Sequence, residues 1–312
     1  MEKDAVIYVA GHRGLVGSAI ERRLRSDGYT RILTRTHSEL DLIDQTSVRN
    51  FFRENKIDAV YLSAARVGGI YANSTYIADF LYENLMIASN VIKAAADTKV
   101  SKLLFLGSTC IYPRDCPQPI KEDYLLTGPL EKSNEGYAIA KIAGLKLCEF
   151  FKRQYGRNFI SAMPTNLYGP GDNYHPVNSH VIPGLLRRFH EAKLSGASTI
   201  TAWGTGLPKR EFLHVDDLAR ALVLLMDQYN DAETINVGTG DEVTIADLVS
   251  LIKDTVGYEG EVVFDSSKPD GTPRKVCDVT KLKALGWQPT LTLGDGLKNA
   301  YEWALENKAF DS

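Results

Sequence analysis

A tyrosine and a lysine stand four positions apart in this sequence, as Tyr137 and Lys141. In a helix this spacing places the phenol and the ammonium on one face, one turn apart. A neighbouring cation lowers the pKa of a phenol from about 10 toward neutrality, so the tyrosine can protonate a carbonyl that receives a hydride. The pair therefore predicts carbonyl reduction, although an exposed helix face carries the same spacing by chance.

Ser108 strengthens that interpretation because it directly follows the apolar run 103–107. Such a run predicts a buried strand, and ligands of doubly wound sheets lie at the carboxyl ends of the strands. A serine at that edge can steady the carbonyl oxygen that Tyr137 protonates.

A glycine-rich turn, Gly11-His12-Arg13-Gly14-Leu15-Val16-Gly17, follows the first predicted strand and opens a helix. One glycine permits the tight turn, one lets the backbone approach a pyrophosphate, and one lets helix and strand pack closely. The helix N-terminus adds amide donors and a positive dipole. We therefore expect residues 11–17 to bind a dinucleotide, although close packing alone would also use three glycines.

The residues after the second predicted strand select the dinucleotide. NAD sites usually place an acidic residue there to hold the ribose 2′-hydroxyl. This chain has Arg35 and His37 instead, with Arg13 nearby in the turn, and this favours NADP. The alternatives are that Arg35 is a solvated loop residue, or that the nearby Glu39 and Asp41 take the acidic role.

Short apolar runs alternate with longer amphipathic segments over the first half of the chain, which is typical of a parallel sheet built from βαβ units. The predicted strands are 6–10, 31–34, 59–63, 103–107 and 159–163, and the predicted helices include 15–27, 78–98 and 137–155. After Met163 the chain is rich in Gly, Pro and Asn, which indicates a functional loop region. Segments 218–229 and 234–237 predict a helix and a strand that return to the main sheet. The expected fold is a doubly wound α/β (Rossmann) sheet, residues 1–165 with 213–238, and a smaller α/β substrate lobe, residues 166–212 with 239–312.

Composition narrows the classes of partner. The 312 residues include 36 Lys and Arg against 39 Asp and Glu, a net charge of -3 that gives no global attraction to nucleic acid or an anionic membrane. No signal peptide or membrane-length apolar run is evident, so we expect a cytoplasmic protein. The four cysteines lack the spacing of a metal site and are expected to be reduced, and we expect no bound metal.

The glycine turn, the strand-end serine and the Tyr-x-x-x-Lys helix together resemble the extended short-chain dehydrogenase/reductases. Within that superfamily the chain is similar to the GDP-L-fucose synthase family from end to end. The segments that carry the similarity are GHRGLVGS at 11–18, ARVGGI at 65–70, GSTCIYP at 107–113, NLYGP at 166–170, SHVIP at 179–183 and REFLHVDD at 210–217.

The resemblance implies that GDP-4-keto-6-deoxy-D-mannose is epimerised at C3 and C5 and then reduced at C4 by NADPH. Protons at C3 and C5 are acidic because both carbons flank the ketone, so one group must remove a proton and another must return it from the opposite face. Cys110 and His180 are the expected pair. A locally positive site would bring the pKa of Cys110 down from about 8.5, and a histidine pKa near 6.5 suits a proton donor. Apart from the resemblance, Cys110 also fits a small buried hydrophobe and His180 a structural hydrogen bond.

The family likeness extends these expectations to ligand contacts. Cofactor contacts are expected at residues 11–17, Arg35, His37, Asp41, Leu106, Gly107, Lys141, Pro164, Asn166, Leu167 and His180. Substrate contacts are expected at Ser108, Thr109, Asn166, Arg188, Trp203, Arg210 and Asp270. Arg187 is an adjacent rival to Arg188. Many relatives carry a second arginine where this chain has His37, which predicts a weaker preference for NADPH over NADH.

Competing activities are separated by a few residues. A 4,6-dehydratase is expected to have acidic residues where this chain has Thr109 and Cys110, and a simple 4-epimerase usually has an acidic residue near position 35. A sister enzyme acting on another GDP-4-keto sugar, such as a heptose, stays open, as does an NADP-binding redox sensor, which usually lacks Tyr137 or Lys141. By analogy with related reductases, helices 78–98 and 137–155 are expected to form a homodimer interface, although burial within one subunit gives the same periodicity.

Overall fold

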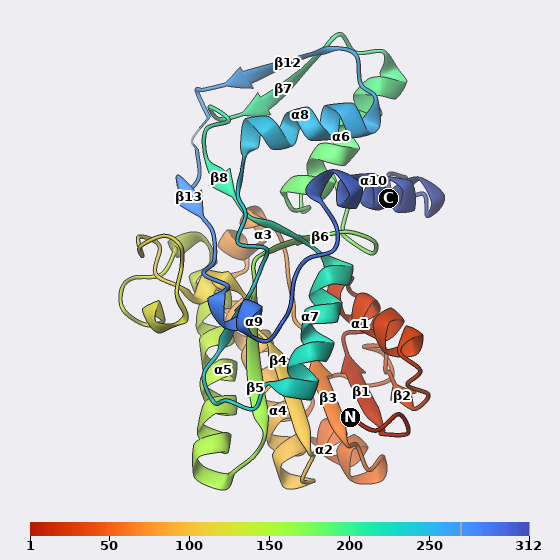
Figure 1. The fold of residues 1–312 in the computed structure, drawn as a ribbon, viewed down its shortest axis with the longest axis vertical. Coiled ribbons are helices and arrows are strands. Elements are labelled where there is room, and N and C mark those ends of the chain that lie inside the picture. Colours follow the sequence, from red (N-terminus) through yellow and green to blue (C-terminus); the bar gives the residue numbers. More distant parts are fainter. Residues whose placement is uncertain (269, 312) are drawn as a thin grey trace.

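The computed structural model describes residues 1–268 and 270–311, so Pro269 of the expected 268–274 loop lies outside the described residues. Figure 1 shows two tiers, a helix-covered sheet that contains the N-terminus and a smaller lobe that contains the C-terminus. Chain connections pass between the two tiers several times.

The larger tier is built on a parallel sheet of six strands, in the order β10-β5-β4-β3-β1-β2. The strands are β1 (Ile7–Ala10), β2 (Ile32–Leu33), β3 (Ala59–Leu62), β4 (Lys102–Leu106), β5 (Phe159–Pro164) and β10 (Ile235–Val237). Most of their residues are buried from both faces, as the continuous apolar runs predict. The doubly wound α/β sheet and the return of segment 234–237 to it are therefore confirmed.

Helices cover both faces of this sheet. Successive residues of a strand face opposite sides, so Tyr8 packs in one apolar cluster and Ile7 in the other. The cluster with Tyr8 receives α2 (Gln45–Glu54), α4 (Ile77–Asp97) and α5 (Glu135–Tyr155). The cluster with Ile7 receives α1 (Leu15–Ser26), α7 (Val215–Gln228) and α9 (Thr280–Ala284). The two cores hold the strand ends, and thus the site, in fixed positions.

The smaller tier has an apolar core of its own, centred on Leu186, Phe189 and Leu248. It contains α6 (Val181–Ser195), α8 (Ile245–Val256), α10 (Leu293–Glu306) and the parallel pair β7 (Thr199–Trp203) and β12 (Glu261–Asp265). A second small sheet joins β8 (Lys209–Arg210) to β11 (Val243–Thr244) and β13 (Arg274–Lys275). These elements confirm a second, smaller α/β unit.

The tiers meet at a short parallel pair, β6 (Asn166–Tyr168) with β9 (Phe212–His214). Composition alone predicts loop at 166–168, but Asn166 is fixed there because its side-chain amide donates to the Glu211 carbonyl oxygen at 2.8 Å. The short helix α3 (Ile70–Thr75) lies near this junction (Figure 1). Among the described residues, no helix has both the length and the apolar character needed to cross a membrane.

Candidate active site

The glycine turn leaves no room for side chains where a dinucleotide would lie. Gly11 has φ +88°, and a Cβ there would be 2.8 Å from the Ala64 backbone. A Cβ on Gly17 would be 2.1 Å from the carbonyl oxygen of Gly11, so α1 packs directly on the turn. Gly14 is the N-cap of α1 and is exposed, which leaves the amide donors of the helix end uncovered. These residues fit a pyrophosphate at the helix N-terminus.

The end of β2 carries the cations that select the dinucleotide. Arg35 donates to the Thr34 carbonyl oxygen at 2.7 Å and lies 5.3 Å above the Phe51 ring. Hydrogen bonds from Thr36 lower the pKa of Glu39, and the positive charges of Arg35 and Arg13 lower it further, so both arginines lie near one point. The His37 side chain is 81 % exposed and lies 3.8 Å from Asp41. Arg13 and Arg35 are thus the 2′-phosphate candidates, whereas His37 lies beside a carboxylate.

Replacing Arg35 with alanine is expected to raise the KM for NADPH while leaving the KM for NADH nearly unchanged. A lost charged hydrogen bond to phosphate is worth about 1.5–3 kcal/mol, or roughly ten- to a hundredfold in affinity. Steady-state kinetics with each cofactor measure the two values. Arg31→Ala, at the other end of β2, is the matched control, because Arg31 is exposed and faces Asp4. An equal rise for both cofactors would remove the phosphate assignment.

The reduction group assembles where α5 crosses the carboxyl end of β4. The Lys141 ammonium is buried and donates to the Leu106 carbonyl oxygen at 2.8 Å. It lies 5.5 Å from the centroid of the Tyr137 ring, as their shared helix face requires. Phe80 of α4 packs edge-on against Tyr137 at 6.5 Å. Packing from two neighbouring elements therefore fixes the phenol and the ammonium beside the strand end that precedes Ser108.

The pKa of Tyr137 differs from the sequence-based expectation. Burial raises the pKa of the Tyr137 phenol well above its usual value, and Cys110 adds to the rise, so the lysine does not bring it toward neutrality. The expectation was wrong because it omitted the loss of hydration. The change still suits reduction, since a phenol that keeps its proton can donate it to an oxygen that gains negative charge.

Burial also lowers the pKa of Lys141 to about 8. The ammonium carries its charge below that pH and loses it above, whereas Tyr137 keeps its proton throughout this range. We expect kcat/KM for NADPH to be level near pH 7 and to fall about tenfold per pH unit above about pH 8. The pH profile of Cys110→Ser is the control, because the same fall in kcat/KM without the thiol shows that Cys110 does not cause it. A profile that stays level for two pH units above that value would contradict a required lysine charge.

Ser108 and Cys110 lie together in the turn that follows β4. Ser108 caps a short 3-10 helix, Thr109–Ile111, and its hydroxyl accepts from the Cys110 amide at 3.4 Å. Burial raises the pKa of the Cys110 thiol, although Ser108, Lys275 and Lys141 each lower it. The expected net lowering was therefore wrong in direction. Cys110 needs a partner that accepts its proton before it can act as a base.

His180 approaches from the other tier, as the N-cap residue of α6. Its imidazole is reached by solvent, yet crowding by protein atoms lowers its pKa below the usual value. The expected value near 6.5 is thus too high, and the resting imidazole is neutral at pH 7. The 65–70 segment lies close to its loop, because a Cβ on Gly69 would be 3.4 Å from the carbonyl oxygens of Asn178 and Ser179. Among the described residues, no hydrogen bond links His180 to Cys110, so their pairing stays a prediction.

The remaining expected cofactor residues line the same strand ends, mostly with buried side chains. Leu106, Gly107 and Pro164 are buried, as is Thr109, so any ligand contact there falls to backbone atoms or to a narrow opening. Asn166 and Leu167 are half-buried at the junction of the tiers. These positions place the expected cofactor residues at the sheet edge, where ligands of doubly wound sheets bind.

The structure separates the two rival arginines of α6. Arg187 is held by Glu191 at 2.7 Å and by the Tyr174 carbonyl oxygen at 3.0 Å. Arg188 is exposed and makes one long bond, at 3.4 Å, to the Thr201 carbonyl oxygen. Arg188 is therefore better placed to receive a ligand phosphate.

Trp203, Arg210 and Asp270 gather on one face of the smaller tier. Trp203 is 69 % exposed at the end of β7, and Arg210 is half-buried on β8. Asp270 lies close enough to Arg210 for each charge to favour the other. The exposed indole suits an aromatic base, and Arg210 together with Arg188, which reaches the Thr201 carbonyl oxygen of β7, suits a pyrophosphate.

Glu211 is a residue that sequence reasoning missed. It is fully buried, and its carboxylate accepts from the amides of Gly240 and Cys277 at 2.7 and 2.8 Å. It thereby ties the start of β9 to two segments that are far from it in the sequence. A glutamate directly before the apolar pair Phe212-Leu213 was the available signal.

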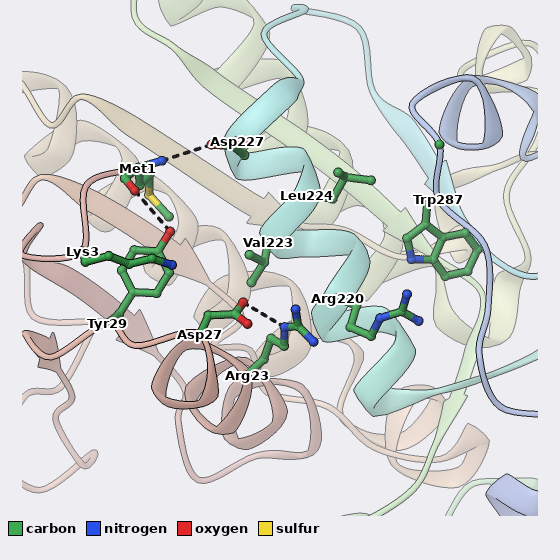
Figure 2. A pocket seen from close by; sticks show the side chains of 11 residues that line it. Met1, Lys3, Arg23, Asp27, Tyr29, Arg220, Val223, Leu224, Asp227 and Trp287 are labelled. Carbon is green, nitrogen blue, oxygen red and sulfur yellow. Dashed lines mark hydrogen bonds and ion pairs between the residues drawn. The ribbon is translucent and has the colours of Figure 1, made fainter.

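The cavity drawn in Figure 2 lies elsewhere, at the amino end of the sheet, between α1, α7 and Trp287, with a volume of about 430 Å³. Its cations already have partners within the protein, such as Asp27 for Arg23 and Asp227 for the Met1 amine. A third, Arg220, pairs with Asp217. The cavity is therefore separate from the reduction group and offers no comparable chemistry.

Known proteins share both sequence and fold with this chain. Residues 7–238 match the NAD dependent epimerase/dehydratase family. GDP-L-fucose synthase 1 of Arabidopsis thaliana is 58% identical over 98% of this chain and 95% of its own length. The GDP-L-fucose synthase of Escherichia coli is 56% identical over 97% of both chains.

Two solved structures extend the likeness to cofactor complexes. A GDP-L-fucose synthetase from Naegleria fowleri bound to NADP has a TM-score of 0.92 at 31% identity, covering 99% of this chain and 95% of that one. A GDP-mannoheptose C4 reductase from Campylobacter jejuni with NADP bound has a TM-score of 0.89 at 37% identity, covering 98% and 99%.

Proposed function

This chain belongs to the NAD dependent epimerase/dehydratase family, and we propose that within it the chain converts GDP-4-keto-6-deoxy-D-mannose to GDP-L-fucose. The conversion is epimerisation at C3 and C5 followed by reduction at C4 with NADPH. The observation that carries the proposal is the gathering of Ser108, Cys110, Tyr137 and Lys141 around the end of β4. Full-length identity of 56–58% to GDP-L-fucose synthases supports it.

In reduction, Tyr137 donates a proton to the C4 oxygen while Ser108 steadies the same atom. Residues 11–17, which include Arg13, would hold NADPH together with Arg35, and the bound cofactor would supply the hydride. Lys141 stays protonated at pH 7 and places positive charge beside the phenol, which favours proton donation. These roles need only the protonation states that burial imposes.

In epimerisation, Cys110 and His180 exchange protons with C3 and C5. Burial keeps Cys110 as a thiol and His180 as a neutral imidazole at rest. Moving one proton from the thiol to the imidazole gives a base and an acid together, without a net change of charge. Ser108 and Lys141 favour that move because both lower the pKa of Cys110.

The GDP moiety binds the smaller tier, with Arg188 and Arg210 on phosphate and Trp203 against the base. Residues 1–165 with 213–238 are assigned to the cofactor domain, and residues 166–212 with 239–312 to the substrate domain, except that α9 packs against the sheet of the cofactor domain. The heptose reductase from Campylobacter jejuni is less similar in sequence, at 37% identity, so the fucose pathway substrate is favoured over a heptose.

We propose a homodimer formed through the helix pair α4 and α5. Their packed surfaces leave exposed apolar side chains, among them Tyr82 at 59 %, Phe150 at 50 % and Tyr155 at 60 %. A second copy would cover these side chains in a four-helix contact, and light scattering after gel filtration would measure the mass of the assembly.

We place the protein in the cytoplasm, where its four unpaired cysteines stay reduced.

The deciding experiment supplies GDP-4-keto-6-deoxy-D-mannose and NADPH in deuterated water. NADPH oxidation with deuterium at C3 and C5 of a GDP-L-fucose product is expected, by absorbance and NMR. Oxidation without label would leave a plain 4-ketoreductase. No turnover here, with turnover of a GDP-4-keto-heptose, would establish the alternative substrate.

A further inference from the structure

An exposed segment of the smaller tier lies beside Trp203 and Arg210. We call this segment the strap and define it as residues 266–268 and 270–273. It begins beyond β12, where the amides of Ser267 and Lys268 donate to Asp265. It ends at Pro273, whose carbonyl oxygen accepts from the Lys209 amide at 2.9 Å, beside β13. Most of its residues are exposed, so apolar packing does little to hold it.

A single side chain in the middle of the strap is anchored. The Asp270 carboxylate accepts from the Thr205 amide at 2.9 Å with one oxygen and from the Thr205 hydroxyl at 2.6 Å with the other. The approach is close because Gly204, with φ +84°, has no side chain, and a Cβ there would be 2.4 Å from the carboxylate. Thr205 in turn accepts from the Leu207 amide at 3.2 Å, which fixes its hydroxyl.

The anchored strap touches the two groups proposed to bind the nucleotide. Lys268 lies 5.9 Å above the Trp203 ring. Gly271 lies against Arg210, since a Cβ there would be 3.0 Å from Nη2 of the guanidinium. Asp270 adds a negative charge near the same guanidinium. The position of the strap therefore sets the surroundings of both Trp203 and Arg210.

We propose that Thr205 is a positioning residue for nucleotide-sugar binding, which holds Asp270 and thereby fixes the strap against Arg210 and Trp203. This inference rests on the proposed function. It assigns Asp270 mainly to the strap, because both carboxylate oxygens already accept from Thr205. Direct recognition of the ligand by Asp270 is the competing reading, since each oxygen keeps a second lone pair.

The first test replaces Thr205 with valine, which keeps the β-branched shape and removes the hydroxyl. We expect the KM for the GDP-sugar to rise about tenfold, the effect of one lost hydrogen bond to a charged group. The kcat for reduction should change by less than about twofold, because Ser108, Tyr137 and Lys141 lie on the other tier. Thr205→Ser should restore the KM, and Thr199→Val, at an exposed threonine in the strand β7 that precedes Thr205, should leave it unchanged.

The second test adds Asp270→Asn, alone and combined with Thr205→Val. If Asp270 acts through Thr205, the KM of the double variant is no higher than that of the single variant with the higher KM. If Asp270→Asn costs far more than Thr205→Val, and its effect persists in the Thr205→Val background, direct recognition replaces the inference. An unchanged KM in Thr205→Val overturns it outright. If the wild-type protein turns over no GDP-4-keto sugar, that result contradicts the proposed function instead.

Discussion

Tyr137→Phe is expected to abolish reduction while sparing epimerisation. The ring would keep its contact with Phe80 and its place beside Lys141, so only the proton donor is lost. A positioned general acid contributes about a hundred- to ten-thousandfold to a rate. NADPH oxidation should therefore fall by about a thousandfold, and the 4-keto sugar should still take up solvent deuterium at C3 and C5.

Tyr155→Phe provides the matched control for this change. Tyr155 lies at the far end of the same helix, is 60 % exposed, and contacts only Phe151 among the ring pairs of the described residues. Its replacement should leave both activities intact. Undiminished NADPH consumption by Tyr137→Phe would show that another group protonates C4.

Cys110→Ser is expected to produce the opposite separation. A serine fits the turn and keeps the amide bond to Ser108, but its hydroxyl is far less acidic than a thiol. Deuterium uptake at C3 and C5 should fall by about a hundredfold or more, while direct reduction of the unepimerised ketone continues. The product should then keep the original configuration at both carbons, as NMR would determine.

Cys116→Ser controls for thiol loss, because Cys116 lies in the following loop and is partly exposed. His180→Asn should repeat the Cys110→Ser phenotype if the two side chains act as a pair. If either variant still takes up deuterium fully at C3 and C5, the replaced residue is not needed for epimerisation.

Local features of the sequence predicted most of the fold and the core of the site. The strands predicted at 6–10, 59–63 and 103–107 form, within one residue at each end, as β1, β3 and β4, because continuous apolar runs fit a sheet covered on both faces. Tyr137 and Lys141 meet because their spacing alone fixes a shared helix face. Each of these relations is decided within a few residues.

The features that sequence did not predict depend on residues far apart. Tyr137 and Cys110 have raised pKa values because packing from several elements removes water, which spacing cannot report. Arg187 and Arg188 are distinguished by Glu191 and by the Tyr174 carbonyl. Thr205 and Asp270 are 65 positions apart, and only the folded chain brings them together.

The two chemistries rest on largely separate anchors and share only the Ser108 turn and the charge of Lys141. Lys141 is held by the carbonyl of Leu106 and Tyr137 by Phe80, whereas Cys110 depends on the Ser108 turn and His180 on the start of α6. A single substitution can therefore abolish proton exchange at C3 and C5 while reduction at C4 continues. During divergence, a lineage could pass from a two-step enzyme to a one-step enzyme by point mutation, without an inactive or unfolded ancestor in between.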